Sequence, residues 1–402
     1  MSGATYEFWL MDDAGRRLFL LDKPANFSYS RSALYLSTLQ IGFTFKEWAA
    51  KVNPFFTPDL RIDIWRSPAD GYPLKREDTY MLRKPEVYTR ADGVQMIMLR
   101  GRDGMDLLNR RVVIQYEDTT YTKKTDYLDD IMKQIVRDQM LYDNCRDYAG
   151  VIDNDRAYPY GEFTVDQDHS FGPSITHAFA GRRVLDILRE LNELSFSMHA
   201  DDTTNRKIYF GVVPVDLSGS INSLQEPAAK TGYQFRTYPD LRGIDRTKGV
   251  EFSVENGNID TPMYIESHLD EVNAVIVMGQ GTNEARAVQE IENLTLIGKS
   301  RWNRCEDVRT ATFETDASGL TSAGMVALGE GRPVISLDCA FLNSPGSRNT
   351  PRSLYGIDWD LGDLLPVSYA GKQFQIEVIN IYVSVDENGV ETISGRTAQD
   401  AE

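Results

Sequence analysis

The feature that most constrains this chain is an internal similarity between residues 59–103 and 360–397. Each segment begins with Asp-Leu, continues through two strand-like stretches and reaches an acidic turn that ends in Gly-Val. A third apolar stretch and a Gly-Arg pair follow in both. Asn388-Gly389 is a favoured pair for a tight hairpin turn, because both residues tolerate positive φ. The two segments are therefore predicted to superpose as equivalent sets of strands.

The remainder of the chain divides into three regions. Residues 1–111 and 245–402 contain short alternating strands with frequent turn residues. Between them, "TDYLDDIMKQIVRDQM" and "GRRVLDILRELNELSF" each place apolar residues on one helical face. Thr125 is the expected N-cap of the first helix, and residues 196–214 read as a hairpin. The predicted fold class is mainly β with an α+β part. It consists of two related β-barrel domains, 1–111 and 245–402, joined by a small α+β domain over 112–244.

Charge and cysteine content restrict the function. A net charge of −17 argues against a protein that grips nucleic acid, since phosphate binding needs clustered Lys and Arg. It is compatible with an acidic wall past which DNA slides. Three widely spaced cysteines suggest no disulfide framework, so folding in a reducing cytosol is expected. The sequence has no evident signal peptide and no apolar run of about 20 residues.

Motifs for catalysis or cofactor binding are weak. His169 and His177 lie near acidic residues, and a hydrogen-bonded loop is favoured over a metal cluster there. In "VIVMGQGTNEAR" Glu284 occupies the third glycine position of a dinucleotide motif, where a carboxylate would oppose a pyrophosphate. We therefore predict no catalytic residue, no cofactor and no metal ligand.

Four residues are predicted to act structurally. Trp65 and Trp359 adjoin apolar strand residues. They are expected to pack in a core or an interface rather than to serve as sugar-binding platforms. Asp363 follows Gly362, where a carboxylate can accept backbone N–H bonds at a turn. Gly389 is the turn glycine of the last hairpin.

The segment "YGIDWDLGDLLPV" with its following hairpin resembles the tail hub proteins of long-tailed bacteriophages. "FWLMDDAGRRLFLLD", "LRIDIWR", "LRGRDGMDLLNRRVV" and "NAVIVMGQGTNEAR" are similar to other parts of that family. The resemblance implies a non-enzymatic virion protein that forms a homotrimer at the distal end of the tail, with two related barrels in each subunit. The partners it implies are the distal tail protein or tube end, the tape measure protein and a tip fibre or receptor-binding protein. DNA would pass without specific binding. Many relatives carry a C-terminal fibre or peptidoglycan-cleaving extension, and none is expected after Glu402.

The internal similarity supports this interpretation independently. Three subunits with two similar barrels each would present six similar surfaces in one ring. Such a ring would match a sixfold tube on one side and a threefold tip on the other. A cell-wall hydrolase and a host-glycan-binding tail-tip protein remain the alternatives.

Overall fold

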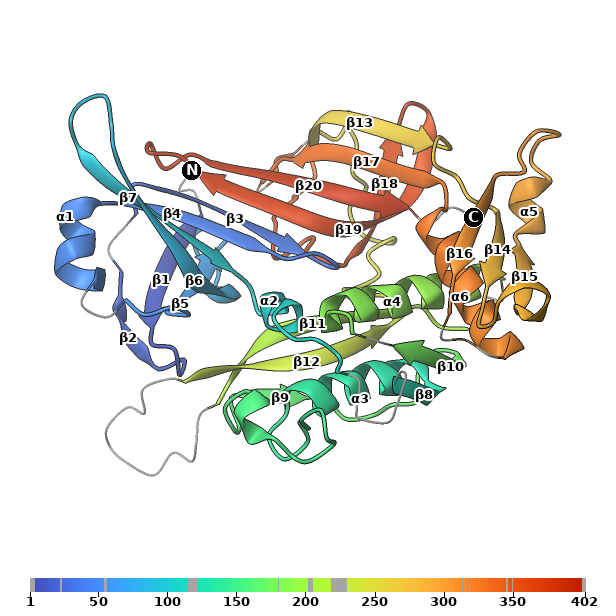
Figure 1. The fold of residues 1–402 in the computed structure, drawn as a ribbon. Helices are drawn as coiled ribbons and strands as arrows, with labels where there is room; N and C mark the ends of the chain where they lie inside the picture. Colours follow the sequence, from blue (N-terminus) through green and yellow to red (C-terminus); the bar gives the residue numbers. More distant parts are fainter. Residues whose placement is uncertain are drawn as a thin grey trace.

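The structure is a computed structural model. It describes residues 4–399 except 22–23, 54–55, 115–121, 180, 202–204, 218–229, 313, 315, 345 and 349. Strands predominate in this part of the chain, with few helices, as predicted. They form one 12-stranded sheet and three small sheets (Figure 1).

The N-terminal region supplies most of one half of the large sheet. Its elements are β1 (Thr5–Met11), β2 (Arg17–Leu20), β3 (Asn26–Ser32), β4 (Thr38–Thr44), α1 (Phe45–Glu47), η1 (Trp48–Val52), β5 (Arg61–Ser67), β6 (Lys75–Thr89), β7 (Gln95–Arg102) and α2 (Met105–Asn109). In β3 the alternating sequence buries Phe27 and Tyr29 on one face and leaves Ser28 and Ser30 on the other. This period of two is what a strand with one covered face requires.

The middle region combines helices with small sheets. Its elements are β8 (Thr122–Tyr127), α3 (Leu128–Met140), η3 (Asn154–Arg156), β9 (Phe163–Val165), β10 (Ser174–Phe179), α4 (Val184–Asp201), β11 (Ile208–Asp216) and β12 (Thr231–Pro239). The apolar stripes of α3 and α4 meet β11 and β12 in a second hydrophobic core.

Two local predictions in this region were wrong. Thr125 does not cap a helix, because β8 pairs with β10 and the Thr125 hydroxyl contacts that of Thr176 at 2.8 Å. Helix α3 therefore begins only at Leu128. Residues 196–201 do not form a hairpin strand, since α4 continues to Asp201 and β11 pairs with β12 instead.

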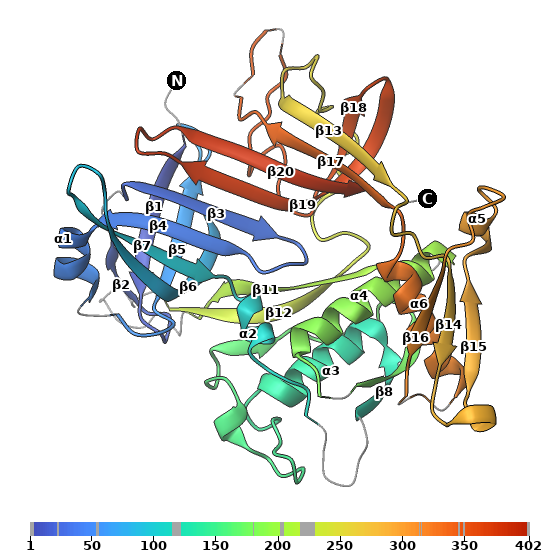
Figure 2. The same ribbon diagram turned by 45° about the horizontal axis from the view of Figure 1, so that its top comes forward.

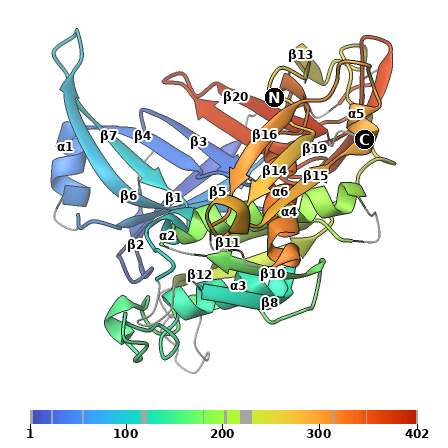
Figure 3. The ribbon, with the colours of Figure 1, turned by 45° about the vertical axis from the view of Figure 1, so that its right-hand side comes forward.

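The C-terminal region completes the large sheet and adds a smaller body. Its elements are β13 (Ile259–Ser267), β14 (Ala274–Met278), η4 (Asn283–Ala285), β15 (Val288–Glu292), α5 (Leu294–Ile297), β16 (Glu306–Thr310), α6 (Ala317–Glu330), β17 (Val334–Phe341), β18 (Leu364–Tyr369), β19 (Lys372–Val385) and β20 (Glu391–Gln399). Helix α6 covers the small sheet of β14, β15 and β16 and also packs on α4 (Figure 3).

The large sheet runs in the order β13-β17-β20-β19-β3-β4-β7-β6-β5-β1-β2, and β18 pairs with another part of β19. Strands from the two ends of the chain thus meet at the β19–β3 pair (Figure 2). One hydrophobic core beneath the sheet contains residues from Phe8 to Leu99 and from Phe252 to Ile393. Within the described residues this sheet is open and no closed barrel is seen. The two-barrel architecture remains a prediction.

Candidate functional site: the junction between two strand units

The two halves of the large sheet are built from the same arrangement of strands. We define unit one as β3, β4, β7, β6 and β5, and unit two as β13, β17, β20, β19 and β18. Each is written in the order of strand pairing. In both units every pair is antiparallel. The similarity between 59–103 and 360–397 therefore lies within a larger five-strand repeat.

The hairpins β6–β7 and β19–β20 have equivalent registers. In unit one the paired residues extend from Thr89 opposite Gln95 back to Lys84 opposite Arg100, where a β-bulge interrupts the ladder. In unit two they extend from Val385 opposite Glu391 back to Asn380 opposite Arg396, and a bulge again interrupts the ladder. The closing turns contain Gly93 and Gly389, with φ of 85° and 79°. Turn length and bulge position are thus the same in both.

The chain also enters β5 of unit one and β18 of unit two in the same way. Asp59 and Gly362 both have positive φ, at 72° and 82°. The Asp59 amide donates to the Leu82 carbonyl at 3.1 Å, and the Gly362 amide donates to the Val378 carbonyl at 2.8 Å. The next residues, Leu60 and Asp363, accept from the amides of Leu82 and Val378 in turn.

Asp363 therefore occupies the place of Leu60. The Asp-Leu pairs that looked equivalent in the sequence, 59–60 and 360–361, do not coincide in the structure.

The two units join where β3 pairs with β19. Val383 lies opposite Tyr29, and Tyr382 lies opposite Ser30. Val383 and Tyr29 are buried in the shared core. We call this β3–β19 junction the seam; it combines main-chain pairing with apolar packing.

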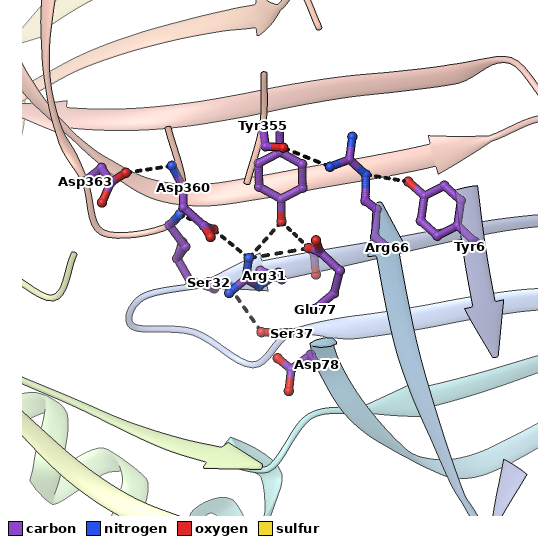
Figure 4. A network of polar contacts seen from close by, with 12 residues as sticks. Tyr6, Arg31, Ser32, Ser37, Arg66, Glu77, Asp78, Tyr355, Asp360 and Asp363 are labelled. Carbon is purple, nitrogen blue, oxygen red and sulfur yellow. Dashed lines mark hydrogen bonds and ion pairs between the residues drawn. The ribbon is translucent and has the colours of Figure 1, made fainter. Parts of the chain in front are cut away.

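A partly buried ionic network crosses the seam (Figure 4). The Arg31 guanidinium on β3 lies 2.6 Å from a carboxylate oxygen of Asp360 and 3.5 Å from one of Glu77. It also donates to the Tyr355 hydroxyl at 2.8 Å, and that hydroxyl donates to Glu77 at 2.5 Å. Burial raises the pKa of Glu77, and the positive charge of Arg31 opposes this.

A second guanidinium in the network is almost completely buried. Arg66 on β5 contacts both carboxylate oxygens of Glu391 on β20, at 2.9 and 3.0 Å. It also donates to the Tyr355 carbonyl at 3.0 Å and to the Tyr6 hydroxyl at 3.1 Å. Such forked Arg–carboxylate contacts fix relative position as well as charge. Arg31 and Arg66 therefore set how unit one and unit two are aligned.

Carboxyl groups lie below this network, on the side of the middle region. Asp103 is buried, and its amide donates to the Ser37 carbonyl at 3.2 Å. Burial and the charge of Asp78 raise the pKa of Asp103 to about 8, and burial raises the pKa of Asp78 to about 6. Arg242 lies close by and donates to the Ala33 carbonyl at 2.7 Å.

The residues singled out in the sequence fall at different places. Trp359 is completely buried and packs against Phe252, Phe341 and Tyr355 in the shared core. Trp65 is only partly buried, and two guanidinium groups, those of Arg17 and Arg76, each lie 5.1 Å from the centre of its ring. Their structural roles stay predictions.

Asp363 accepts hydrogen bonds at one edge of the seam. Its carboxylate accepts from the Ile244 amide at 2.7 Å, the Asp360 amide at 2.8 Å and Arg246 Nε at 2.5 Å. Gly389 closes the β19–β20 turn. The structural roles of both residues also stay predictions.

The residues at the seam could not be found from local sequence. Arg31, Glu77 and Glu391 lie far apart along the chain, and each resembles an ordinary strand residue. The available signal was the repeat itself, which implies that the units contact one another.

One face of the large sheet is lined mainly by small uncharged side chains, with Tyr382 among them and with Glu86, Arg100 and Arg102 on unit one. They project from the side of each strand opposite the core, as strand alternation requires. The small uncharged side chains are Asn26, Ser28, Ser30, Thr38, Gln40, Asn380, Ser384, Thr392 and Ser394. Beside them a pocket of about 620 Å3 is lined by Arg83, Lys84, Arg100, Arg102, Arg110, Arg183 and Asp106, among others. The face is thus mainly neutral, with one basic region on unit one.

The residues considered for metal or cofactor chemistry do not converge. His169 lies 3.5 Å from Asp166 and stacks on Phe171, whereas His177 is buried 3.0 Å from Glu190. Among the described residues, no group of three or more His, Cys, Asp or Glu side chains could hold a metal ion. No helix in the described part is long and apolar enough to cross a membrane.

The comparisons with known proteins agree with this architecture. A family model described as Siphovirus ReqiPepy6 Gp37-like protein matches residues 75–395. The chain belongs to this family of siphovirus tail proteins. No curated protein sequence matches the chain.

The chain shares its fold with solved tail proteins. The tail protein of Neisseria meningitidis MC58 has a TM-score of 0.53 at 9% identity, covering 99% of this chain and 97% of its own. The 43 kDa tail protein of prophage MuSo2 from Shewanella oneidensis has a TM-score of 0.53 at 12% identity, covering 98% of each chain. Prophage tail protein gp18 of Listeria monocytogenes EGD-e has a TM-score of 0.51 at 9% identity, covering 98% and 94%.

Proposed function

We propose that this protein is a non-enzymatic trimeric hub at the distal end of the phage tail. The duplication of unit one in unit two carries the proposal, because three copies would place six equivalent strand units around one axis. Six similar surfaces can dock on a sixfold tail tube, whereas the rest of each subunit repeats only three times. The ring would thereby adapt the tube to a threefold tip.

The neutral face of the large sheet suits the wall of the DNA exit channel. Small hydroxyl and amide side chains such as Ser28, Ser30 and Ser384 offer no fixed positive charge for phosphate to grip, and the basic region is confined to unit one. The sequence suggested an acidic wall from net charge alone, and the side chains on this face support a mainly neutral one instead. DNA would pass over it without specific binding.

The domain organisation is proposed accordingly. Residues 1–111 and 245–402 would form the two barrel-related hub domains, and 112–244 the α+β domain between them. Because both hub domains contribute to one core, we propose that they act as one body in the ring. The barrel would close only when subunits assemble.

The partners follow from this position in the tail. The distal tail protein or tube end would bind the sixfold side, and a tip fibre or receptor-binding protein the threefold side. The tape measure protein would end at the channel. The protein would fold in the host cytoplasm before it joins the virion.

The test is the mass of the purified protein, alone and with its tube-end partner, together with an assay for peptidoglycan hydrolysis and glycan binding. We expect a trimeric mass and neither activity. A stable monomer in both samples, or specific hydrolysis of cell-wall polymer, would overturn the proposal.

A further inference from the structure

Each chain has two strand edges that are equivalent to the two strands of the β3–β19 seam but are unpaired in the described residues. They are the edge of β6 over 84–89 and the edge of β13. In unit two, β18 pairs with the first part of β19, and β3 then pairs with residues 380–385. In unit one, β5 likewise pairs with the first part of β6, but among the described residues nothing pairs with that side of 84–89. Strand β13, the equivalent of β3, pairs only with β17 in the described part of the chain.

Apolar side chains on the two unpaired edges are more exposed than apolar side chains at the β3–β19 seam. Val383 on β19 is buried, whereas its equivalent on β6, Val87, is 56% exposed. On the other edge, Met263 of β13 is 53% exposed. The two free edges lie at opposite sides of the sheet, so they cannot cover each other within one chain (Figure 2).

We propose that residues 84–89 of β6 in one copy pair antiparallel with β13 of a second copy. This rests on the proposed ring and specifies its interface. The seam inside the chain gives the register. Val383 faces Tyr29, and their equivalents by strand pairing are Val87 and Tyr264.

The same equivalence places Tyr88 opposite Met263 and Glu86 opposite Ile265 of the neighbouring copy. Each copy has one edge of each kind, so the contact is head-to-tail and three copies can close.

Charge on the two edges is complementary. The β6 edge begins with Arg83 and Lys84, both exposed, and β13 carries the exposed carboxylate of Glu266. The proposed register sets Glu266 opposite Pro85 and Ser267 opposite Lys84 of the neighbour, so these opposite charges lie at the same end of the interface without a direct ion pair.

Pro85 and Pro262 remove one N–H donor from each edge, which is tolerated only where strands are free or lightly bonded. Pairing there would therefore use fewer hydrogen bonds than the internal seam, and neither edge would pair well with a copy of itself.

A disulfide test reads this register directly. In the Tyr88→Cys, Met263→Cys double variant, the two Cα atoms of neighbouring copies should lie about 5 Å apart, within disulfide range. Mild oxidation should give a covalent trimer as the main product on a non-reducing gel. The matched control, Tyr88→Cys with Ser267→Cys, moves one cysteine four residues along β13 and should give little trimer.

Native mass of the same samples separates the two proposals. A trimer that forms without the in-register cross-link, or that cross-links equally in the control, would overturn the edge pairing and leave the ring standing. Monomers with no cross-link would overturn both. A covalent trimer in the Tyr88→Cys, Met263→Cys sample alone would establish the register.

Discussion

Trp359 and Trp65 show how differently two tryptophans of one sheet are held. Trp359 packs against aromatic rings in the shared core, whereas Trp65 contacts the guanidinium groups of Arg17 and Arg76 and stays partly exposed. Trp359→Ala should lower the free energy of unfolding by about 3–5 kcal/mol, because it removes a buried ring and leaves a cavity. Trp65→Ala should cost less, since its loss is mainly of cation–π contacts worth about 0.5–2 kcal/mol. Urea unfolding of both variants measures this. Equal losses would contradict the assignment.

The buried carboxyl of Asp103 makes a prediction about pH. Its pKa is raised to about 8 in the folded protein and is about 3.9 in an unfolded chain. The folded state therefore binds the proton more tightly, and this contribution to stability is lost as pH rises from about 4 through 8. Asp103→Asn should weaken that loss, so the stability of the variant relative to the wild type should rise between about pH 4 and pH 8. Unfolding measured across this range tests it. An unchanged pH slope would contradict a neutral Asp103.

At the scale of elements, the equivalent turns of the β6–β7 and β19–β20 hairpins make matched substitutions possible. Gly93 and Gly389 share positive φ and the same place in the turn. Gly389→Ala should cost about 1–2 kcal/mol, since a Cβ disfavours the left-handed conformation. Gly93→Ala should cost a similar amount. Thermal melting of the two single variants checks this. A neutral substitution at either position would show that the turns differ.

Substitutions on the unpaired edge of β6 test whether this edge forms the contact between copies. Val87 and Val94 are exposed valines of the same hairpin, 56% and 43% accessible. Val87→Arg should reduce trimer content strongly and leave the melting of the monomer unchanged, because the proposed pairing buries Val87 only between copies. Val94→Arg, near the turn, should leave the trimer intact. Analytical ultracentrifugation of both variants would measure this. Equal effects would place the interface elsewhere.

At the scale of the whole molecule, the shared core predicts that the first half does not fold alone. Residues 1–244 lack β19, so β3 would lose its neighbour and Arg66 would lose Glu391. A guanidinium left buried without its carboxylate costs about 3–5 kcal/mol. This fragment should therefore show no cooperative melting and should regain it when co-expressed with 245–402. Cooperative unfolding of residues 1–244 by themselves would argue for independent domains.

The sequence by itself determined the mainly β class, helix α4 from its apolar stripe, and the existence of two similar segments. These rest on periodicity and turn chemistry, which are local properties of the chain. Even so, the match of Asp59-Leu60 with Asp360-Leu361 was displaced. The true equivalence, of Asp59 with Gly362 and of Leu60 with Asp363, follows from backbone hydrogen bonds to Leu82 and Val378. These bonds cannot be read from the amino-acid sequence.

Only the tertiary structure decided that the segments belong to five-strand units joined at β3 and β19, and that Arg31 and the buried Arg66 meet their carboxylate partners there. The reason is physical: pairing and burial depend on neighbours hundreds of residues away. The alternation of apolar residues in a strand predicts which face is buried but not which strand it pairs with.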